Sequence, residues 1–410
     1  MKIFHNIITL SIIVMSFSCQ QSLTGQAPKD SQWRGEKRDG VYNETGLLKA
    51  WPADGPELLW FYEGLGAGFT SAAIANERLY ITGLSGNELL LFVFNLKGEL
   101  LYKKEVGKEE SERYPGPRST VVVNDGKLYI YNALGKLICL DENTFSEIWS
   151  KEILTDFGGV DTDWGVTESP LIVGEKIFIT PGGTEHNIVA FNKNTGALIW
   201  SSPGSGTRSA YCSPQYIEGY SVPMLVTSNA EYIIAVNADT GEPLWTFPQQ
   251  HEYDVHPNTP LYHDGMIMST AGYRVGTVMI RLKDNGKAVE EVWKNPMDNQ
   301  IGGAIKIDNF IYATGHQNNR FLHCIDWNTG ETKYLSNDIR EANIIYADGM
   351  LYCYSNTGDM FLVQPGLTNF EIKGRFRITK GTEQHWAHPV IHNGVMYLRH
   401  GDALMAYRVK

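Results

Sequence analysis

Two stretches of the sequence share one pattern that decides the fold: AFNKNTGALIW at residues 190–200 and AVNADTGEPLW at residues 235–245. Each is typical of a strand, a tight turn and a second strand. An Asn or Asp before Thr-Gly supplies the side-chain hydrogen bond and the left-handed position that a short hairpin needs. Looser copies are CLDENTFSEIW at residues 139–149 and CIDWNTGETKY at residues 324–334. The pattern predicts a chain of repeated antiparallel hairpins.

The aromatic residue that ends each copy recurs about every 45 residues, which is the length of one four-stranded propeller blade. These residues are Trp60, Tyr102, Trp149, Trp200, Trp245, Trp293, Tyr334 and Phe376. An apolar strand, a turn and a second strand precede the hairpins, in eight copies. The copies span residues 74–81, 121–130, 171–179, 215–227, 261–268, 305–312, 344–352 and 390–397.

The last copy has no outer strand after it, whereas residues 58–60 have the outer-strand pattern without a blade before them. We therefore predict an all-β fold: one eight-bladed β-propeller of four-stranded antiparallel blades over residues 58–410. The N-terminal strand around Trp60 would close the last blade. Closure of this kind removes the free sheet edges that invite aggregation.

The composition excludes several classes of protein. The 410 residues are 42% hydrophobic and 20% charged, which is too apolar for a disordered chain. The net charge is −11, and the charged residues are spread along the sequence without a basic block. We therefore expect no nucleic-acid partner. Length alone favours two or three domains, but the repeat replaces this expectation with a single ring.

The N-terminus has the pattern of an export signal. Lys2, an apolar run and small residues before Cys19 predict a signal peptide over residues 1–18. Cys19 stands where a lipobox places the acylated residue, although Ser16 replaces the usual Leu; ordinary secretion is the alternative. Residues 19–32 would be a lipidated tether and residues 33–57 an N-terminal cap. We expect an exported protein that lipid anchors to a bacterial membrane, on the periplasmic or surface face of the outer membrane.

The hairpin copies resemble the propeller repeat of pyrroloquinoline-quinone (PQQ) dehydrogenases and of PQQ-like lipoproteins, over residues of about 58 to 410. The opening QWRGEKRDG at residues 32–40 is similar to the start of the PQQ-like lipoproteins. The resemblance implies the fold and leaves two activities open: a PQQ dehydrogenase with calcium, or a scaffold lipoprotein of outer-membrane barrel assembly. The adjacent cysteine pair common in the dehydrogenases is absent, as is a Cys-x-x-Cys-His haem site.

The four cysteines beyond Cys19 are Cys139, Cys212, Cys324 and Cys353. The sequence contains no Cys-x-x-Cys spacing, so the cysteines do not indicate a zinc site. Cys139 and Cys324 stand where other copies place Ala, so small buried side chains explain them. A disulfide between Cys324 and Cys353 stays open, because strand position alone does not decide it.

Alignment of the blades gives two columns of residues facing the central channel. The first column is small and polar: Ser71, Thr120, Ser169, Ser213, Thr259, Gly303, Asn343 and His388. The second lies two residues earlier, on the same strand face: Phe69, Arg118, Thr167, Tyr211, Pro257, Ile301, Glu341 and Trp386. The nearby loops add Asp161, Asp163, Trp164, Glu168, Arg208, His256, Asn258, Gln300 and His385.

These side chains predict a ligand site at the mouth of the channel, since they combine aromatic faces, guanidinium groups, carboxylates and imidazoles. The predicted ligand-binding residues are Arg118, Trp164, Glu168, Arg208, Tyr211, His256, Glu341, Asn343, His385, Trp386 and His388. The candidate catalytic residues are His388, Glu341, Tyr211 and Arg118. We predict no metal site: His385 and His388 would point to opposite faces of a strand. Glu168, Asn258 and Asp161 could supply oxygen ligands for calcium, but their spacing in the sequence is not diagnostic of a calcium site.

The favoured function is a lipoprotein whose propeller binds a small polar ligand, such as a saccharide, or a partner protein at the channel mouth. The alternatives are a PQQ-dependent alcohol or sugar dehydrogenase, a scaffold in outer-membrane assembly, and a propeller enzyme acting on acidic polysaccharide. The missing cysteine pair favours a protein without enzymatic activity.

Overall fold

The computed structural model describes residues 28–410 apart from residues 111, 161, 251, 302 and 367. The predicted signal peptide, the lipidation site Cys19 and the tether up to residue 27 lie outside the described residues. Within the described part of the chain, no helix is both long and apolar enough to cross a membrane.

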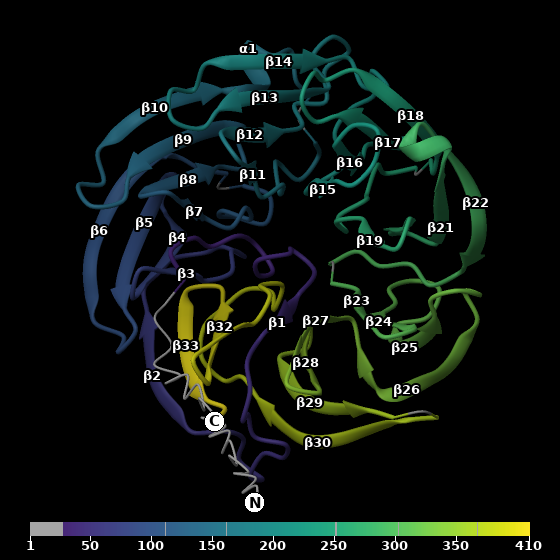
Figure 1. Cartoon of the computed structure of the whole chain (residues 1–410). Helices are drawn as coiled ribbons and strands as arrows, with labels where there is room; N and C mark the ends of the chain where they lie inside the picture. The colour runs from purple at the N-terminus through teal and green to yellow at the C-terminus, as the bar shows by residue number, and fades with distance from the viewer. Residues whose placement is uncertain (1–27, 111, 161, 251, 302, 367) are drawn as a thin grey trace, which may run out of the picture.

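Eight antiparallel sheets surround a central hub as the blades of a propeller (Figure 1). Blades 1 to 4 follow in chain order. They contain β3 (Ala73–Ala75), β4 (Arg78–Ser85), β5 (Glu88–Asn95) and β6 (Leu100–Lys108); β7 (Val122–Asn124), β8 (Lys127–Tyr131), β9 (Lys136–Asp141) and β10 (Glu147–Glu152); β11 (Leu171–Val173), β12 (Lys176–Ile179), β13 (Ile188–Asn192) and β14 (Leu198–Ser202); and β15 (Gln215–Ile217), β16 (Met224–Ser228), β17 (Tyr232–Asn237) and β18 (Pro243–Pro248). The short helix α1 (Ile153–Asp156) follows blade 2.

Blades 5 to 8 complete the ring. They contain β19 (Leu261–His263), β20 (Met266–Ala271), β21 (Gly276–Lys283) and β22 (Ala288–Asn295), with the 3-10 turn η1 (Asp284–Gly286); β23 (Ile305–Ile307), β24 (Phe310–Thr314), β25 (Phe321–Asp326) and β26 (Thr332–Arg340); β27 (Ala342–Ala347), β28 (Met350–Ser355), β29 (Asp359–Pro365) and β30 (Phe370–Arg377); and β31 (Val390–His392), β32 (Val395–His400) and β33 (Ala403–Arg408).

Blade 8 takes its outer strand from the other end of the chain. Strand β2 (Leu58–Glu63) pairs antiparallel with β33, with Trp60 opposite Ala406 and Phe61 opposite Met405. The eight-bladed ring closed by an N-terminal strand is thus confirmed. One strand was not predicted: β1 (Val41–Tyr42) pairs parallel with β27, so the sheet of blade 7 has five strands rather than four.

The aromatic residues of the outer strands lock each blade to the next. Trp60, Trp149, Trp200 and Trp293 donate from the indole nitrogen to main-chain carbonyls of the following blade, at 2.9 to 3.2 Å. The turn glycines Gly98, Gly196, Gly241 and Gly330 lie against these rings, where an added Cβ would come within 2.5 to 2.8 Å. The turn glycine of each repeat therefore permits the hairpin and also leaves room for the neighbouring indole.

Substitution of one such glycine separates the two roles. We expect Gly241→Ala to lower the free energy of unfolding by about 3 kcal/mol, because it adds a clash with Trp200 to the cost of a left-handed backbone. Gly126→Ala is the control: Gly126 has a φ of +72° against +78° for Gly241, but open space around it, so only about 1 kcal/mol is expected. Urea unfolding of both variants measures the difference; equal losses would mean that the indole contact contributes nothing.

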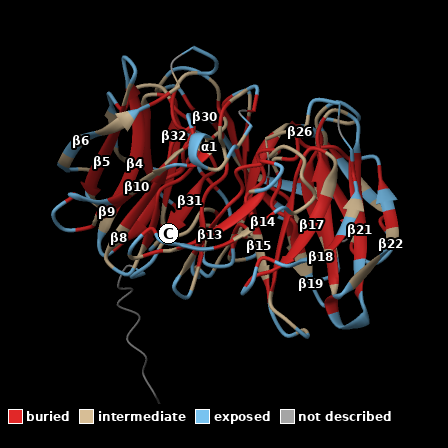
Figure 2. Cartoon of the chain, turned by 90° about the horizontal axis from the view of Figure 1, so that it is seen from above, coloured by how far each residue is buried: buried red, intermediate tan, exposed pale blue. Residues whose placement is uncertain are grey.

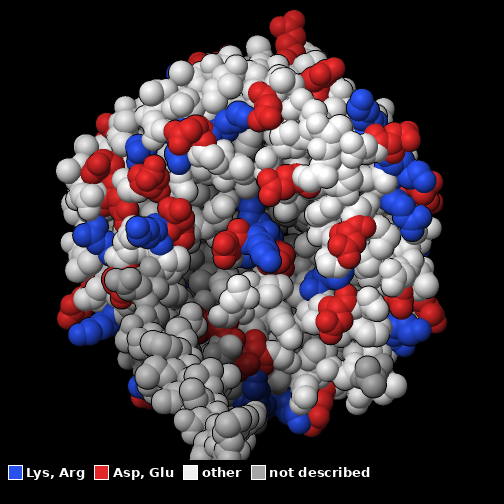
Figure 3. Space-filling view, in the orientation of Figure 1, with Lys and Arg blue, Asp and Glu red and all other residues white. Residues whose placement is uncertain are grey.

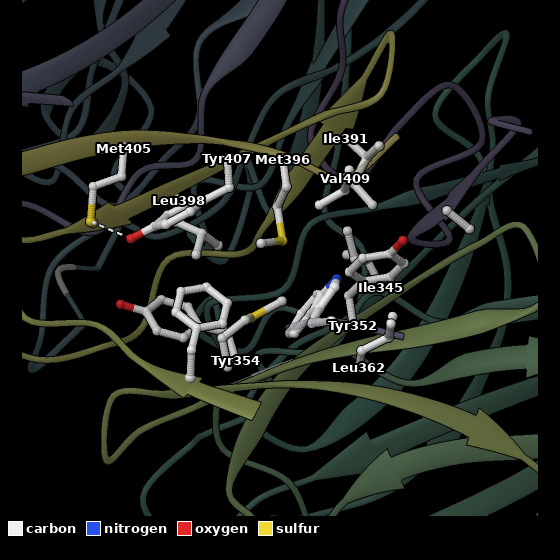
Figure 4. Packing of buried hydrophobic residues seen from close by; sticks show 14 of the residues in the cluster. Ile345, Tyr352, Tyr354, Leu362, Ile391, Met396, Leu398, Met405, Tyr407 and Val409 are labelled. Carbon is white, nitrogen blue, oxygen red and sulfur yellow. Dashed lines mark hydrogen bonds between the residues drawn. The ribbon is translucent and has the colours of Figure 1, made fainter. Parts of the chain in front are cut away.

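The core lies between the blades rather than inside one central body. Buried residues occupy the inner strands, whereas the outer strands carry most of the exposed surface (Figure 2). Figure 4 shows the cluster between blades 7 and 8, where Tyr352 and Leu362 from one sheet pack with Met396 and Leu398 from the next. Each sheet buries both faces in this way, which explains the apolar runs of the inner strands.

The four cysteines of the described chain are free and buried. Cys324 on β25 and Cys353 on β28 lie in the same core cluster between blades 6 and 7, as separate thiols. Burial raises the pKa of Cys324 above its ordinary value, so the thiol is protonated at neutral pH.

Candidate functional site

A belt of small hydroxyl side chains joins the blades around the channel. The main-chain N–H of His388 donates to Ser71 Oγ, that of Ser71 to Thr120 Oγ1, that of Thr120 to Ser169 Oγ and that of Ser169 to Ser213 Oγ, at 2.9 to 3.2 Å. Five members of the first aligned column therefore have a structural role, and two of them, Ser213 and His388, also line the cavity described next. The hydrogen bonds of these five residues fix the first strands of blades 8, 1, 2, 3 and 4 against one another.

The second column lines a cup-shaped cavity of about 360 Å³ at the hub. Seven of its eight members reach the cup; Glu341 does not. The full lining, which we call the aromatic cup, is Trp33, Phe69, Tyr114, Arg118, Trp164, Thr167, Tyr211, Ser213, Val255, Pro257, Tyr273, Gln300, Ile301, Trp386 and His388. The volume is in the range of small-molecule sites.

Aromatic rings form two groups in the lining. In one group, Trp164 stacks on Tyr211 with centroids 5.6 Å apart and on Tyr273 at 6.3 Å. In the other, Trp386 packs against Phe69 at 5.0 Å and against Tyr114 at 5.1 Å. Gln300 donates to the Tyr273 hydroxyl at 2.8 Å and so fixes that ring. Both groups present apolar faces to one cavity.

The N-terminal segment, residues 28–43, runs across the hub. Ser31 exchanges main-chain hydrogen bonds with Val123, Arg38 donates to the carbonyls of Ser169 and Pro170 at 2.8 and 2.9 Å, and Arg34 donates to that of Ala304 at 2.9 Å. Figure 1 shows β1 beside the centre of the ring, and in Figure 3 basic and acidic side chains lie together at the centre of the same face.

Trp33 separates the aromatic cup from a second cavity of about 650 Å³, since its side chain lines both. The second cavity lies between the N-terminal segment and the first strands of blades 1, 2 and 8. The indole of Trp33 meets His388 edge-to-face, with centroids 5.3 Å apart. The N-terminal segment therefore supplies part of the wall of the cup.

His388 is 6% exposed in this wall. Burial, and then the positive charge of Arg34, lower the pKa of His388 well below its ordinary value, while a hydrogen bond to the main chain of Ile301 acts in the opposite direction. The imidazole is thus neutral at pH 7. Its Nδ1 has no hydrogen-bond partner among the described residues. With the proton on the other nitrogen, Nδ1 is a buried acceptor.

Arg118 lines the cup, but its guanidinium already binds main chain. It donates to the carbonyls of Arg113 at 2.6 Å, Tyr114 at 2.8 Å and Gly116 at 3.3 Å. These bonds hold the loop that carries Tyr114 over the cavity. Burial raises the pKa of the Tyr211 hydroxyl to about 12, so this group stays protonated at neutral pH.

Three predicted site residues lie inside the channel rather than in the cup. Glu168 is 2% exposed and accepts hydrogen bonds from the Thr180 main chain and hydroxyl. Asn343 is buried and donates to the main-chain carbonyl of Trp386 at 2.6 Å, which holds the backbone at that position. His256 is fully buried. They act on the lining only indirectly.

Arg208, Glu341 and His385 lie elsewhere. Arg208 pairs with Asp254 outside the lining. Glu341 pairs with Arg320 at 3.0 Å. His385 packs between blades 7 and 8, where Tyr354 bonds its Nδ1 at 2.7 Å and the His400 ring stacks on it at 3.6 Å. It points away from His388, as expected for residues three apart on an extended backbone.

The sequence reasoning did not place Trp33, Tyr114 and Tyr273 in the site. Tyr114 and Tyr273 come from loops outside the aligned columns, and both have left-handed backbones, with φ of 49° and 47°. Their directions depend on these unusual conformations, which no residue pattern marked. Trp33 was assigned to a cap, and only its contact with His388 links it to the cup.

The residues present do not fit PQQ with calcium. None of the described residues that line the cup is an Asp or Glu, so these residues offer calcium no carboxylate ligand; Asp161 lies outside the described residues. Among the described residues, no three His, Cys, Asp or Glu side chains form a group that could hold a metal ion. The carboxylates of PQQ would meet one guanidinium, which is bound to three carbonyls.

Comparison with known proteins gives relatives of two kinds. Over 197 residues the chain is 27% identical to the outer membrane protein assembly factor BamB of Kangiella koreensis, covering 44% of this chain and 47% of that protein. It is 28% identical over 150 residues to the quinoprotein ethanol dehydrogenase of Pseudomonas aeruginosa, covering 33% of this chain and 24% of the enzyme. The matches thus span about half, or less, of these relatives.

Solved structures share the fold. BamB from Moraxella catarrhalis superposes with a TM-score of 0.61 at 13% identity, covering 86% of this chain and 99% of that one. The quinohemoprotein alcohol dehydrogenase from Comamonas testosteroni superposes with a TM-score of 0.64 at 11% identity, covering 92% of this chain and 80% of that one. One family profile, described as outer membrane protein assembly factor BamB, matches residues 93–216 and 140–369. The chain belongs to this BamB-like family of PQQ-repeat propellers, which is related to the quinoprotein alcohol dehydrogenases.

Proposed function

We propose that this protein is an outer-membrane lipoprotein that acts as a scaffold in the assembly of outer-membrane proteins. The observation that carries the proposal is the family match over residues 93–216 and 140–369, which covers most of the ring. The assembly factors BamB of Kangiella koreensis and Shewanella oneidensis are among the relatives. A lipid on Cys19 would hold the propeller at the membrane surface.

The arrangement of the candidate catalytic residues supports a scaffold over an enzyme. General acid–base catalysis needs a side chain that reaches the reacting group and has a pKa near the operating pH. Arg118 is bound to three carbonyls, and Glu341, held by Arg320, is not part of the lining. His388 lines the cup, but its pKa lies well below its ordinary value, and none of the described lining residues is a carboxylate that could pair with it.

Purification of the full-length protein from cross-linked, detergent-solubilised outer membranes tests the proposal. We expect components of the barrel-assembly machinery to co-purify with the wild-type protein. Cys19→Ser should move the protein from the membrane to the soluble fraction and reduce the recovery of those components at least tenfold. A membrane-bound protein that recovers none of them would refute the scaffold function.

We also propose that the aromatic cup is a ligand site, as a second function. This proposal is supported by the size of the cavity and by the two aromatic groups on its walls. Saccharides are one class that stacks on such faces. Calorimetric titration with a panel of glycans, compared between the wild type and Trp386→Ala, measures whether any saccharide binds there.

A further inference from the structure

The two faces of the propeller differ in what they carry. The first strand of each blade begins near the cup and ends at a hairpin turn: Arg118 of the cup precedes β7, and the turn at Asp125 follows it. Because the strands of a blade are antiparallel, the turn between its third and fourth strands lies at the same end. We call this end the hairpin face. The aromatic cup lies toward the opposite face.

The N-terminal segment enters the ring at the hairpin face. The main-chain N–H of Asn76, in the turn after β3, donates to the carbonyl of Pro28 at 2.9 Å. That of Asp125, in the turn after β7, donates to the carboxylate of Asp30 at 2.9 Å. Residues 28–30 are therefore held against the hairpin turns of blades 1 and 2.

The chain between Cys19 and this entry point is short. Cys19 lies nine residues before Pro28. A fully extended chain of this length spans about 30 Å. A folded domain of the size described has a radius of gyration of about 21 Å, so it is roughly 50 Å wide. A lipid on Cys19 is thus tied too closely to reach around the ring to the cup, and it keeps the hairpin face of blades 1 and 2 near the membrane.

Exposed aliphatic side chains lie at the hairpin face in the same part of the ring. They occupy the first two positions of four outer strands, each is 38 to 51% exposed, and we call them the apolar rim: Leu58 on β2, Leu100 and Leu101 on β6, Ile148 on β10, and Leu198 and Ile199 on β14. These strands belong to the consecutive blades 8, 1, 2 and 3 and follow one another around one half of the ring (Figure 1).

The rim does not follow from the repeat. Its residues stand one or two positions before the aromatic residue of the outer strand. In blades 5, 6 and 7 the exposed residue at these positions is charged, namely Glu291, Lys333 and Arg375. Since all the blades share one backbone pattern, folding does not require exposed aliphatic side chains there. Their concentration beside residues 28–30 indicates a contact outside the propeller.

We infer that the apolar rim rests on the lipid surface to which Cys19 is anchored, and that the aromatic cup faces away from the membrane. The inference rests on the lipid anchor of the proposed function and adds the orientation of the ring. Partly inserted aliphatic side chains give a lipidated protein a second attachment to the bilayer. Exposed charges of both signs flank the rim, such as Lys97, Glu99 and Glu147, so the contact is apolar rather than electrostatic.

Quenching by nitroxide-labelled lipid measures which side of the ring lies at the bilayer. The full-length acylated protein is placed in vesicles of phosphatidylethanolamine and phosphatidylglycerol with a bimane label at Ile199→Cys; the native cysteines of the described chain are buried. We expect this label to be quenched about threefold more strongly than a label at Val275→Cys, in the turn that carries Tyr273 of the cup, or at Leu335→Cys on blade 6. Added salt should leave this pattern unchanged, because the contact is apolar.

Removal of the rim tests whether these side chains make the contact. Leu101→Ser combined with Leu198→Ser, with the label at Ile148→Cys, should reduce the quenching about threefold. Leu335→Ser combined with Ile372→Ser removes two exposed aliphatic side chains outside the rim and should leave the quenching unchanged.

Equal quenching at Ile199, Val275 and Leu335, or stronger quenching at Val275, would overturn the inference. So would a rim variant that is quenched as strongly as the protein with an intact rim. Protein that does not attach to the vesicles would overturn it together with the lipid anchor. Attached protein with a different quenching pattern leaves the scaffold function standing, because the co-purification test does not depend on the orientation of the ring.

Discussion

Replacement of Arg399 by Met is expected to lower the free energy of unfolding by about 3 kcal/mol. Arg399 is 2% exposed at the seam where blade 8 meets blade 1. Its guanidinium donates to the carbonyls of Thr82 at 2.6 Å, Gly66 at 3.3 Å and Gly401 at 2.8 Å, and to the Thr70 hydroxyl. Methionine fills similar volume but removes the guanidinium donor from these carbonyls and from the Thr70 hydroxyl.

Arg408→Met provides a matched control in the same blade. Arg408 also joins blade 8 to the N-terminal part of the chain, through Glu57 at 2.8 Å, but both side chains are more than half exposed. An exposed ion pair contributes about 0–1 kcal/mol. In chemical unfolding, Arg399→Met should therefore lower the free energy of unfolding severalfold more than Arg408→Met does. Similar losses would show that ring closure does not depend on the buried guanidinium.

Replacement of Glu168 by Gln is expected to remove part of the pH dependence of stability. Burial raises the pKa of Glu168 to about 7, against the two hydrogen bonds from Thr180 and the nearby charge of Arg38, which lower it. Because the folded-state pKa lies above the unfolded one, the contribution to stability is fully present below the unfolded pKa and is lost as the pH rises through about 7. The loss is about 3 kcal/mol at most.

Unfolding free energies of the wild type and Glu168→Gln, measured between about pH 4 and pH 8, check this expectation. The variant should gain stability relative to the wild type as the pH rises. Glu36→Gln, which removes an exposed carboxylate of the N-terminal segment, should run parallel to the wild type. A constant offset for Glu168→Gln would mean that the carboxyl titrates alike in the folded and unfolded chains.

The ring could be predicted from the sequence because each blade carries its own local signals. The Thr-Gly turns and the outer-strand aromatics recur at one spacing, and the same spacing exposed the unpaired strand at Trp60. Repetition also fixed the register, so residues of one column, such as Arg118, Tyr211 and Trp386, could be placed at one level of the channel before the structure was known.

The rest of the site depends on contacts that do not repeat. Trp33 and Arg34 precede the blades in the chain, and their positions follow from a ring contact with His388 of blade 8 and a hydrogen bond to Ala304 of blade 6. Glu341 matched its column in sequence, but its loop has a φ of 37° there and its carboxylate pairs with Arg320. A shared alignment position gave no information on these local backbone conformations.

The central claim is that this propeller serves outer-membrane protein assembly. The most direct measurement is the amount of folded outer-membrane β-barrel protein, scored by heat-modifiable gel mobility, in cells that lack this chain. The account predicts a reduced amount, which is restored by the wild type and not by Cys19→Ser. An unchanged amount of folded barrels in cells that lack the chain would contradict it.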